Sequence, residues 1–173
     1  QLFDKVNGRR PNEYSALERL EVGRLLTEII NQEQSSSKTW DAKLFPGTWK
    51  LVYFERGGVD RRIPFPEFGF NDQYQIFGND NNDNAASVTN IGELWGPNLF
   101  VQVLGTYREV DPSSPSSSPK RLEANISGGQ FCIGSHPAAA ADPIAKKCVY
   151  LPIEGVGLFE SLYLGPRLRI LQN

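Results

Sequence analysis

"PGTWKLVYFERGG", residues 46–58, carries a Gly-x-Trp triplet that runs into a β-rich stretch and stops at a Gly-Gly turn. Gly47 allows the chain to bend tightly as it enters the strand, because glycine adopts backbone angles that other residues avoid. Trp49 then places a large flat ring near one end of the strand. Two interpretations follow: an arbitrary core strand of a β domain, or the opening strand of a barrel that is built to hold something.

The chain after Phe45 favours many short strands. Short apolar runs alternate with turn residues, and 16 Gly and 12 Pro supply frequent turns. We expect strands at 48–55, 74–77, 87–94, 99–110, 121–126, 130–133, 149–153, 158–164 and 168–171. The polar segments 79–86 and 111–119 are expected to be flexible loops. The pattern predicts a mainly β fold, an antiparallel barrel or sandwich of about eight strands.

One helix is expected to precede the strands, over residues 15–32. Ser15 and Glu18 have the spacing of a capping box, and apolar residues recur at helical spacing after them. The expected apolar face consists of Ala16, Leu17, Leu20, Val22, Leu25, Leu26, Ile29 and Ile30. We expect this helix to dock on the core. The whole chain, 1–173, is then a single domain with its barrel over about 45–171.

The composition limits the classes of function. Lys plus Arg (18) and Asp plus Glu (20) nearly balance, and this argues against a nucleic-acid-binding protein. No stretch approaches the roughly 20 apolar residues that span a bilayer, so no transmembrane span is expected. The chain begins with Gln1 and contains no Met, from which we expect a processed or trimmed product. Cys132 and Cys148 could pair, but small buried thiols are the favoured interpretation.

Catalytic constellations are not visible in the sequence. A Ser-His-Asp triad would have to use the single histidine, His136, but the sequence has no Gly-x-Ser-x-Gly motif for the nucleophile. No Cys-x-x-Cys pair offers metal ligands. No phosphate-binding glycine loop follows a strand. We therefore predict no catalytic residue, no metal site and no required cofactor, and we interpret His136 as an ordinary loop residue.

Four segments carry a resemblance to a known family. They are "ALERLEVGRLLTEIINQ" (16–32), "LFPGTWKLVYFERGG" (44–58), "SVTNIGEL" (87–94) and "LFESLYLGPRLRIL" (158–171). Together they resemble the plastid lipid-associated proteins, also called fibrillins or plastoglobulins, over residues 14–171. The family usually has an acidic residue where this chain has Gly165, and it continues past "RILQN" with a further strand. The chain therefore looks like a divergent member with a shortened C-terminus.

The resemblance implies a lipocalin-like barrel without catalysis. Such a protein binds or sequesters an isoprenoid-type lipid or pigment, for example a carotenoid or a quinone, at a chloroplast thylakoid or plastoglobule surface. In lipocalin-like proteins the Trp of Gly-x-Trp plugs the closed end of the barrel and a late Arg packs across its indole. This implies that Trp49 packs on Arg167 or Arg169. The expected lining residues are Trp49, Leu51, Tyr53, Phe100, Phe131, Tyr150, Phe159 and Tyr163.

A second function stays open beside the lipid carrier. The same barrel could be a structural subunit that docks peripherally on a thylakoid photosynthetic membrane complex. In the stretch "IPFPEFGF" (63–70), Phe65, Phe68 and Phe70 are the expected contacts with a lipid surface or a protein partner. The identity of the ligand and the side of the membrane do not follow from the sequence.

Overall fold

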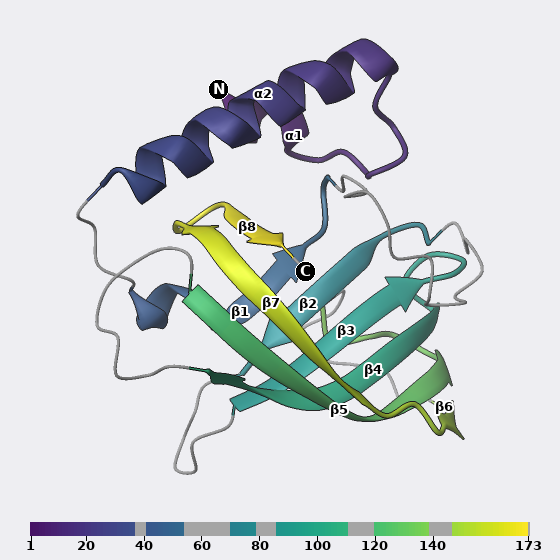
Figure 1. Ribbon diagram of the computed structural model, residues 1–173. Coiled ribbons are helices and arrows are strands. Elements are labelled where there is room, and N and C mark those ends of the chain that lie inside the picture. The colour runs from purple at the N-terminus through teal and green to yellow at the C-terminus, as the bar shows by residue number, and fades with distance from the viewer. Residues whose placement is uncertain (37–40, 54–69, 79–85, 111–119, 139–146, 173) are drawn as a thin grey trace.

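A computed structural model describes residues 1–36, 41–53, 70–78, 86–110, 120–138 and 147–172 (Figure 1). The helical elements are α1 (Leu2–Val6), α2 (Ala16–Gln34) and the 3₁₀ turn η1 (Ala42–Leu44). The strands are β1 (Gly47–Lys50), β2 (Gln73–Phe77), β3 (Ala86–Glu93), β4 (Leu99–Glu109), β5 (Lys120–Ile133), β6 (Lys147–Leu151), β7 (Gly155–Leu164) and β8 (Arg169–Gln172). The prediction of a mainly β fold with about eight antiparallel strands and a preceding helix is confirmed. The expected loops at 79–86 and 111–119 lie outside the described residues, except for Ala86, which begins β3.

The eight strands form one antiparallel sheet in the order β1-β2-β3-β4-β5-β7-β8, and β6 pairs with β5 beside this path. The sequence predicted two strands, 121–126 and 130–133, where the structure has the single 14-residue strand β5. Gly128 and Gly129 do not break this strand: they pair with Leu104 and Val103 of β4, and the register shifts beside them, where Ser127 is left out of the ladder as in a β-bulge. One half of β5 pairs with β7 and the other half pairs with β6.

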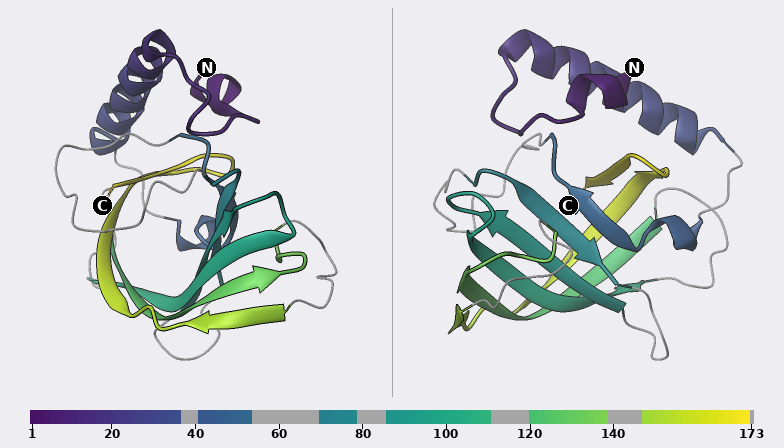
Figure 2. Two further views of the ribbon diagram at one scale, coloured as in Figure 1. Left: turned by 90° about the vertical axis from the view of Figure 1, so that its right-hand side faces the viewer. Right: turned by 180° about the vertical axis from the view of Figure 1, so that it is seen from behind.

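The sheet curls into a half-barrel with a concave and an outer face (Figure 2). The concave side is identified by contacts between strands that are distant in the sheet: the Phe77 ring of β2 lies 6.4 Å from the Phe159 ring of β7. Its core consists of Phe45, Phe77, Val88 and Leu122, with the half-buried Trp49, Tyr107, Ala124, Phe159, Leu164 and Leu171 packed around them. We call this aromatic end the closed end. It is formed where β2 and β4 end and where β3 and β5 begin.

The helices bridge the two edge strands of the curled sheet (Figure 1). Their core consists of Leu2, Val6, Tyr14, Val22 and Leu25, with Leu26, Ile29, Val52, Tyr53 and Leu168 packed against it. On the β1 side, the Tyr14 hydroxyl donates to the Val52 carbonyl at 2.9 Å. On the β8 side, the Arg167 guanidinium lies 3.8 Å from the centre of the Phe3 ring. No backbone pairing between β1 and β8 occurs in the described parts of the chain, so side chains and helices close the seam between them.

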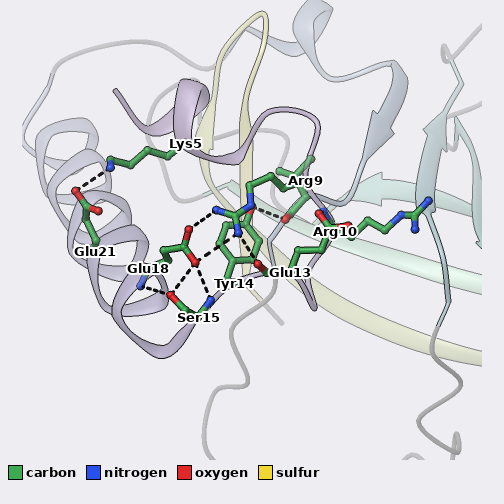
Figure 3. Close-up of polar contacts among 9 residues, drawn as sticks. Lys5, Arg9, Arg10, Glu13, Tyr14, Ser15, Glu18 and Glu21 are labelled. Atoms are coloured by element: carbon green, nitrogen blue, oxygen red, sulfur yellow. Dashed lines mark hydrogen bonds and ion pairs between the residues drawn. The ribbon is translucent and has the colours of Figure 1, made fainter.

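Helix α2 begins as predicted, with a capping box between Ser15 and Glu18. Figure 3 shows the Glu18 carboxylate accepting from the Ser15 backbone N–H at 2.8 Å and from Arg9 Nη1 at 2.7 Å. The Arg9 guanidinium, together with the Ser15 bonds, lowers the pKa of Glu18 to about 2. The predicted apolar face is too broad: Leu17 and Leu20 are 80% and 73% exposed. Among the described residues, helix α2 packs on α1 and over the seam between β1 and β8, and Val22 and Leu25 are its buried side chains.

The two cysteines form a disulfide, which corrects the interpretation of two buried thiols. Cys132 and Cys148 are directly opposite each other on β5 and β6, with their Cα atoms 4.1 Å apart. The pairing of β5 with β6 brings together two residues separated by 16 positions in sequence. No pattern in the sequence indicates that their Cα atoms are close enough for a disulfide. Within the described ranges, no helix is both long and apolar enough to cross a membrane.

Candidate ligand-binding site

A hollow of about 270 Å³ lies on the concave face of β2, β3 and β4. It is lined by Phe70, Gln73, Tyr74, Gln75, Asn90, Ile91, Gly92, Val101 and Val103. The ladders explain this set: Gln75 is opposite Asn90, which is in turn opposite Val103, so these three side chains share one face. Because Trp49 is opposite Gln75, that face continues to the closed end. We call this cavity the inner hollow.

Arg169 separates the inner hollow from the closed end. Its guanidinium carbon lies 5.0 Å from the centre of the Trp49 ring and 4.4 Å from that of Phe77. Burial lowers the pKa of Arg169 to about 9, so the group still carries its charge at neutral pH. The arginine expected on Trp49 is therefore Arg169, whereas Arg167 packs on Phe3 instead.

A chain of hydrogen bonds leads from Arg169 into the inner hollow. Arg169 Nη2 donates to Gln75 Oε1 at 2.6 Å, and Gln75 Nε2 donates to Asn90 Oδ1 at 2.9 Å. The other terminal nitrogen, Arg169 Nη1, is buried and has no hydrogen-bond partner among the residues that the structure describes. The lining of the hollow thus combines the polar Gln75 and Asn90 with the apolar Val101, Val103 and Phe70.

Phe70 lies directly against the backbone of β3. A Cβ atom on Gly92 would stand 2.7 Å from two carbons of the Phe70 ring, so only glycine permits this contact. The sequence interpretation of Phe70 as a lipid or partner contact does not anticipate this position in the wall of a cavity. Phe65 and Phe68, the other two expected contacts, lie outside the described residues.

Four of the expected lining residues share the concave face. Trp49 and Phe159 pack at the closed end, and Phe131 is opposite Val101, a residue of the inner hollow. Leu51 lies beside the hollow, since its backbone N–H bonds to the Gln73 carbonyl at 2.8 Å.

The other four expected lining residues lie elsewhere. Phe100 is fully buried on the outer face with Ile91 and Cys132, and Tyr150 is 59% exposed. Tyr53 packs on Tyr14 beneath the helices, with ring centres 5.2 Å apart. Tyr163 follows a register shift in β7 that moves it off the face of Phe159. The physical reason is the two-residue alternation of strands: one register error or one bulge transfers a side chain to the opposite face.

His136 is not the ordinary loop residue that the sequence suggested. It is fully buried, and its Nε2 lies 2.8 Å from Oε1 of the buried Glu93. Its ring packs near Tyr74 and Phe100, with centres 5.3 and 5.2 Å away. The pair fastens the segment after β5 over the outer apolar cluster, on the side of the sheet opposite the inner hollow.

The sequence reasoning also missed Gln75 and Asn90, because polar residues in a strand normally indicate a solvent-facing side.

The chain matches no known protein family, no curated protein and no solved structure. Within the described ranges, no group of three or more His, Cys, Asp or Glu side chains is arranged to hold a metal ion. The lining residues of the inner hollow offer apolar burial and hydrogen bonding to a ligand.

Proposed function

We propose that this protein is a non-catalytic carrier that binds an isoprenoid-type lipid or pigment, such as a carotenoid or a quinone, in the inner hollow. The main support for this proposal is the inner hollow, which lies on the concave face beside the closed end. Barrels of about eight strands are just wide enough to hold one small ligand. Apolar burial of about 25 cal/mol per Å² against Val101, Val103 and Phe70 supplies the affinity.

The resemblance to the plastid lipid-associated proteins supports the ligand class and the cellular location. It suggests attachment to a thylakoid or plastoglobule surface in the chloroplast. The Gly-x-Trp at β1 and the Arg169 that covers Trp49 agree with a lipocalin-like barrel end.

The direct test is to purify the protein from its own membranes and to extract it with organic solvent. Chromatography with absorbance and mass detection should find a carotenoid, a quinone or a related lipid at up to one molecule per chain. Replacing Val103 with Asp, which puts a charge into the wall of the hollow, should remove that molecule. Protein that repeatedly yields no bound lipid, and that takes none up from liposomes, would contradict the proposal.

A second candidate is a structural subunit of a thylakoid membrane complex, and one observation favours it. Trp95, Ile133 and Val149 are 83%, 60% and 66% exposed at the end of the sheet opposite the closed end. They come from neighbouring segments, since Gly134 donates to the Asn98 carbonyl of the β3–β4 turn and Ile133 is opposite Lys147. We call these three side chains the open-end patch. Exposed apolar side chains that gather at one end suit a protein partner.

The subunit function predicts that the protein migrates with a large complex after mild solubilisation. Replacing Ile133 and Val149 with Ser should release it without unfolding it, because both side chains are mostly exposed. A protein that stays in the complex with both substitutions, or that never migrates above the size of the free chain, would argue against docking through this patch.

A further inference from the structure

Arg169 fixes the direction of every hydrogen bond between itself and the inner hollow. A guanidinium group has only N–H donors and no acceptor. Its partner atom on Gln75, 2.6 Å away, must therefore be the carbonyl oxygen Oε1. This settles the orientation of the Gln75 amide, whose oxygen and nitrogen would otherwise be assigned from the network alone.

Asn90 is the next residue in the chain of hydrogen bonds. With its oxygen held by Arg169, Gln75 can offer only Nε2 to Asn90, and it donates to Asn90 Oδ1 at 2.9 Å. The acceptor of Asn90 is thereby occupied, and its Nδ2 donors make no hydrogen bond to a described residue. Asn90 lines the inner hollow, so those donors are left for whatever occupies the cavity.

The charge on Arg169 stands behind this chain of amides. In the described part of the molecule, no carboxylate forms an ion pair with Arg169, and Asp72 on the β1–β2 side pairs with Arg10 and Lys50. Arg169 Nη1 is in addition a buried donor without a partner among the described residues. The positive charge of Arg169 polarises the amides of Gln75 and Asn90, so an acceptor that meets the Asn90 donors forms a stronger hydrogen bond than it would with an isolated amide. A hydrocarbon leaves the Asn90 donors without an acceptor.

We infer that the inner hollow selects apolar molecules that carry a hydrogen-bond-accepting oxygen, a carbonyl or a carboxylate, at their buried end. The acceptor meets the donors of Asn90, and the apolar body lies against Val101, Val103 and Phe70. This inference rests on the proposed carrier function and narrows its ligand class. A pure hydrocarbon is excluded as the preferred ligand.

The test compares matched ligands on the wild-type protein. Decyl-1,4-benzoquinone offers a neutral carbonyl, dodecanoate offers a carboxylate, and decylbenzene has the same ring and chain as the quinone without an acceptor. Equilibrium dialysis should give at least about tenfold tighter binding of one or both acceptor ligands than of decylbenzene, as one good hydrogen bond provides. The stronger of the two acceptor ligands identifies the source of the oxygen.

Two variants test the role of Asn90. Asn90→Asp keeps the shape of the side chain but replaces its donors with an acceptor, so it should weaken the acceptor ligands at least about tenfold and leave decylbenzene unchanged. Thr89→Val lies on the same strand and faces the opposite side, so it should change none of the three affinities. Melting curves show whether each variant is folded.

Equal binding of decylbenzene and decylbenzoquinone, with dodecanoate no tighter, would overturn the inference while leaving the carrier function intact. Unchanged acceptor affinity in folded Asn90→Asp would do the same. Failure of all three ligands to bind would overturn the carrier function together with the inference. If Asn90→Asp does not fold, the wild-type comparison decides alone.

Discussion

The closed end and the open end of this half-barrel are made from the same strands but differ in almost every physical respect. At the closed end, Phe45, Phe77 and Leu122 are no more than 3% exposed, whereas Ile133 and Val149 at the open end are at least 60% exposed. The inner hollow lies between them, with Arg169 as its border. At the closed end the concave face is filled by packed side chains, whereas next to it the same face encloses the inner hollow.

Removing an aromatic ring from the closed end should have the largest effect on stability. Phe77 contacts the rings of Phe45 and Tyr107 and is almost completely buried. Phe77→Ala should lower the free energy of unfolding by about 3–5 kcal/mol, measured by denaturant titration. The matched change at the open end, Val149→Ala, should cost less than about 0.5 kcal/mol. Similar losses in the two variants would show that the ends do not differ in stability.

The open end carries a covalent link between two strands, in addition to the packing of its outer apolar cluster. Cys132 and Cys148 close a loop of 16 residues between β5 and β6. Reducing the disulfide should destabilise the protein by about 3 kcal/mol, because the unfolded chain regains the entropy of that loop. Thermal melting with and without dithiothreitol measures the effect, and Cys132→Ala/Cys148→Ala should melt like the reduced protein. An unchanged melting temperature would mean that the open end gains nothing from the link.

A smaller change probes the wall of the inner hollow. Gly92→Ala places a methyl group against the Phe70 ring, which must move. We expect a loss of about 1–2 kcal/mol in unfolding free energy and weaker ligand binding, because the displaced ring alters the cavity. Gly157→Ala is the control: its new Cβ would meet nothing within 4 Å. If both variants bind and unfold alike, Phe70 does not shape the hollow.

The smallest expected effect concerns the helices that cover the seam. The pKa of Glu18 is lowered to about 2 from its ordinary 4.5, chiefly by Arg9. The folded state therefore binds this proton less readily than the unfolded state. The stabilisation is complete above about pH 4.5 and is lost as the pH falls toward 2. Glu18→Gln should thus melt a little below the wild type at pH 7, and the gap should close by pH 2. A gap that stays constant would show that the ionised carboxylate is not responsible.

Local signals in the sequence predicted the framework well. The capping box located the start of α2, and alternating apolar runs located most strands within a few residues. Faces were harder to predict, as the run "LFVQV" (99–103) shows. Phe100 and Val101 are equally apolar, and the structure buries Phe100 on the outer face because Ala138 and His136 cover that side. Because a second apolar cluster covers the outer face, this strand is apolar on both of its faces. The alternation of apolar and polar residues that would assign each side chain to a face is therefore absent.

The candidate site was predicted only at its border. The Gly-x-Trp motif and the late arginines indicated that Trp49 meets Arg167 or Arg169, and the structure places Arg169 there. The polar lining residues Gln75 and Asn90 were not predicted, because the hydrogen bond from Arg169 to Gln75 joins residues 94 positions apart. Such a contact depends on how far the whole sheet curls, which no local pattern encodes.

The seam between β1 and β8 bears on the order in which the strands pair and the helices dock during folding. From β1 to β5 every strand pairs with its neighbour in the sequence, and short turns join β3 to β4 and β7 to β8. Such nearby partners meet quickly, because little chain entropy is lost in bringing them together. No long-range backbone ladder has to form at the seam in the described parts of the chain. We expect the hairpins to form first and the docking of Arg169 and the helices to come last, as side-chain packing on a sheet that is already paired.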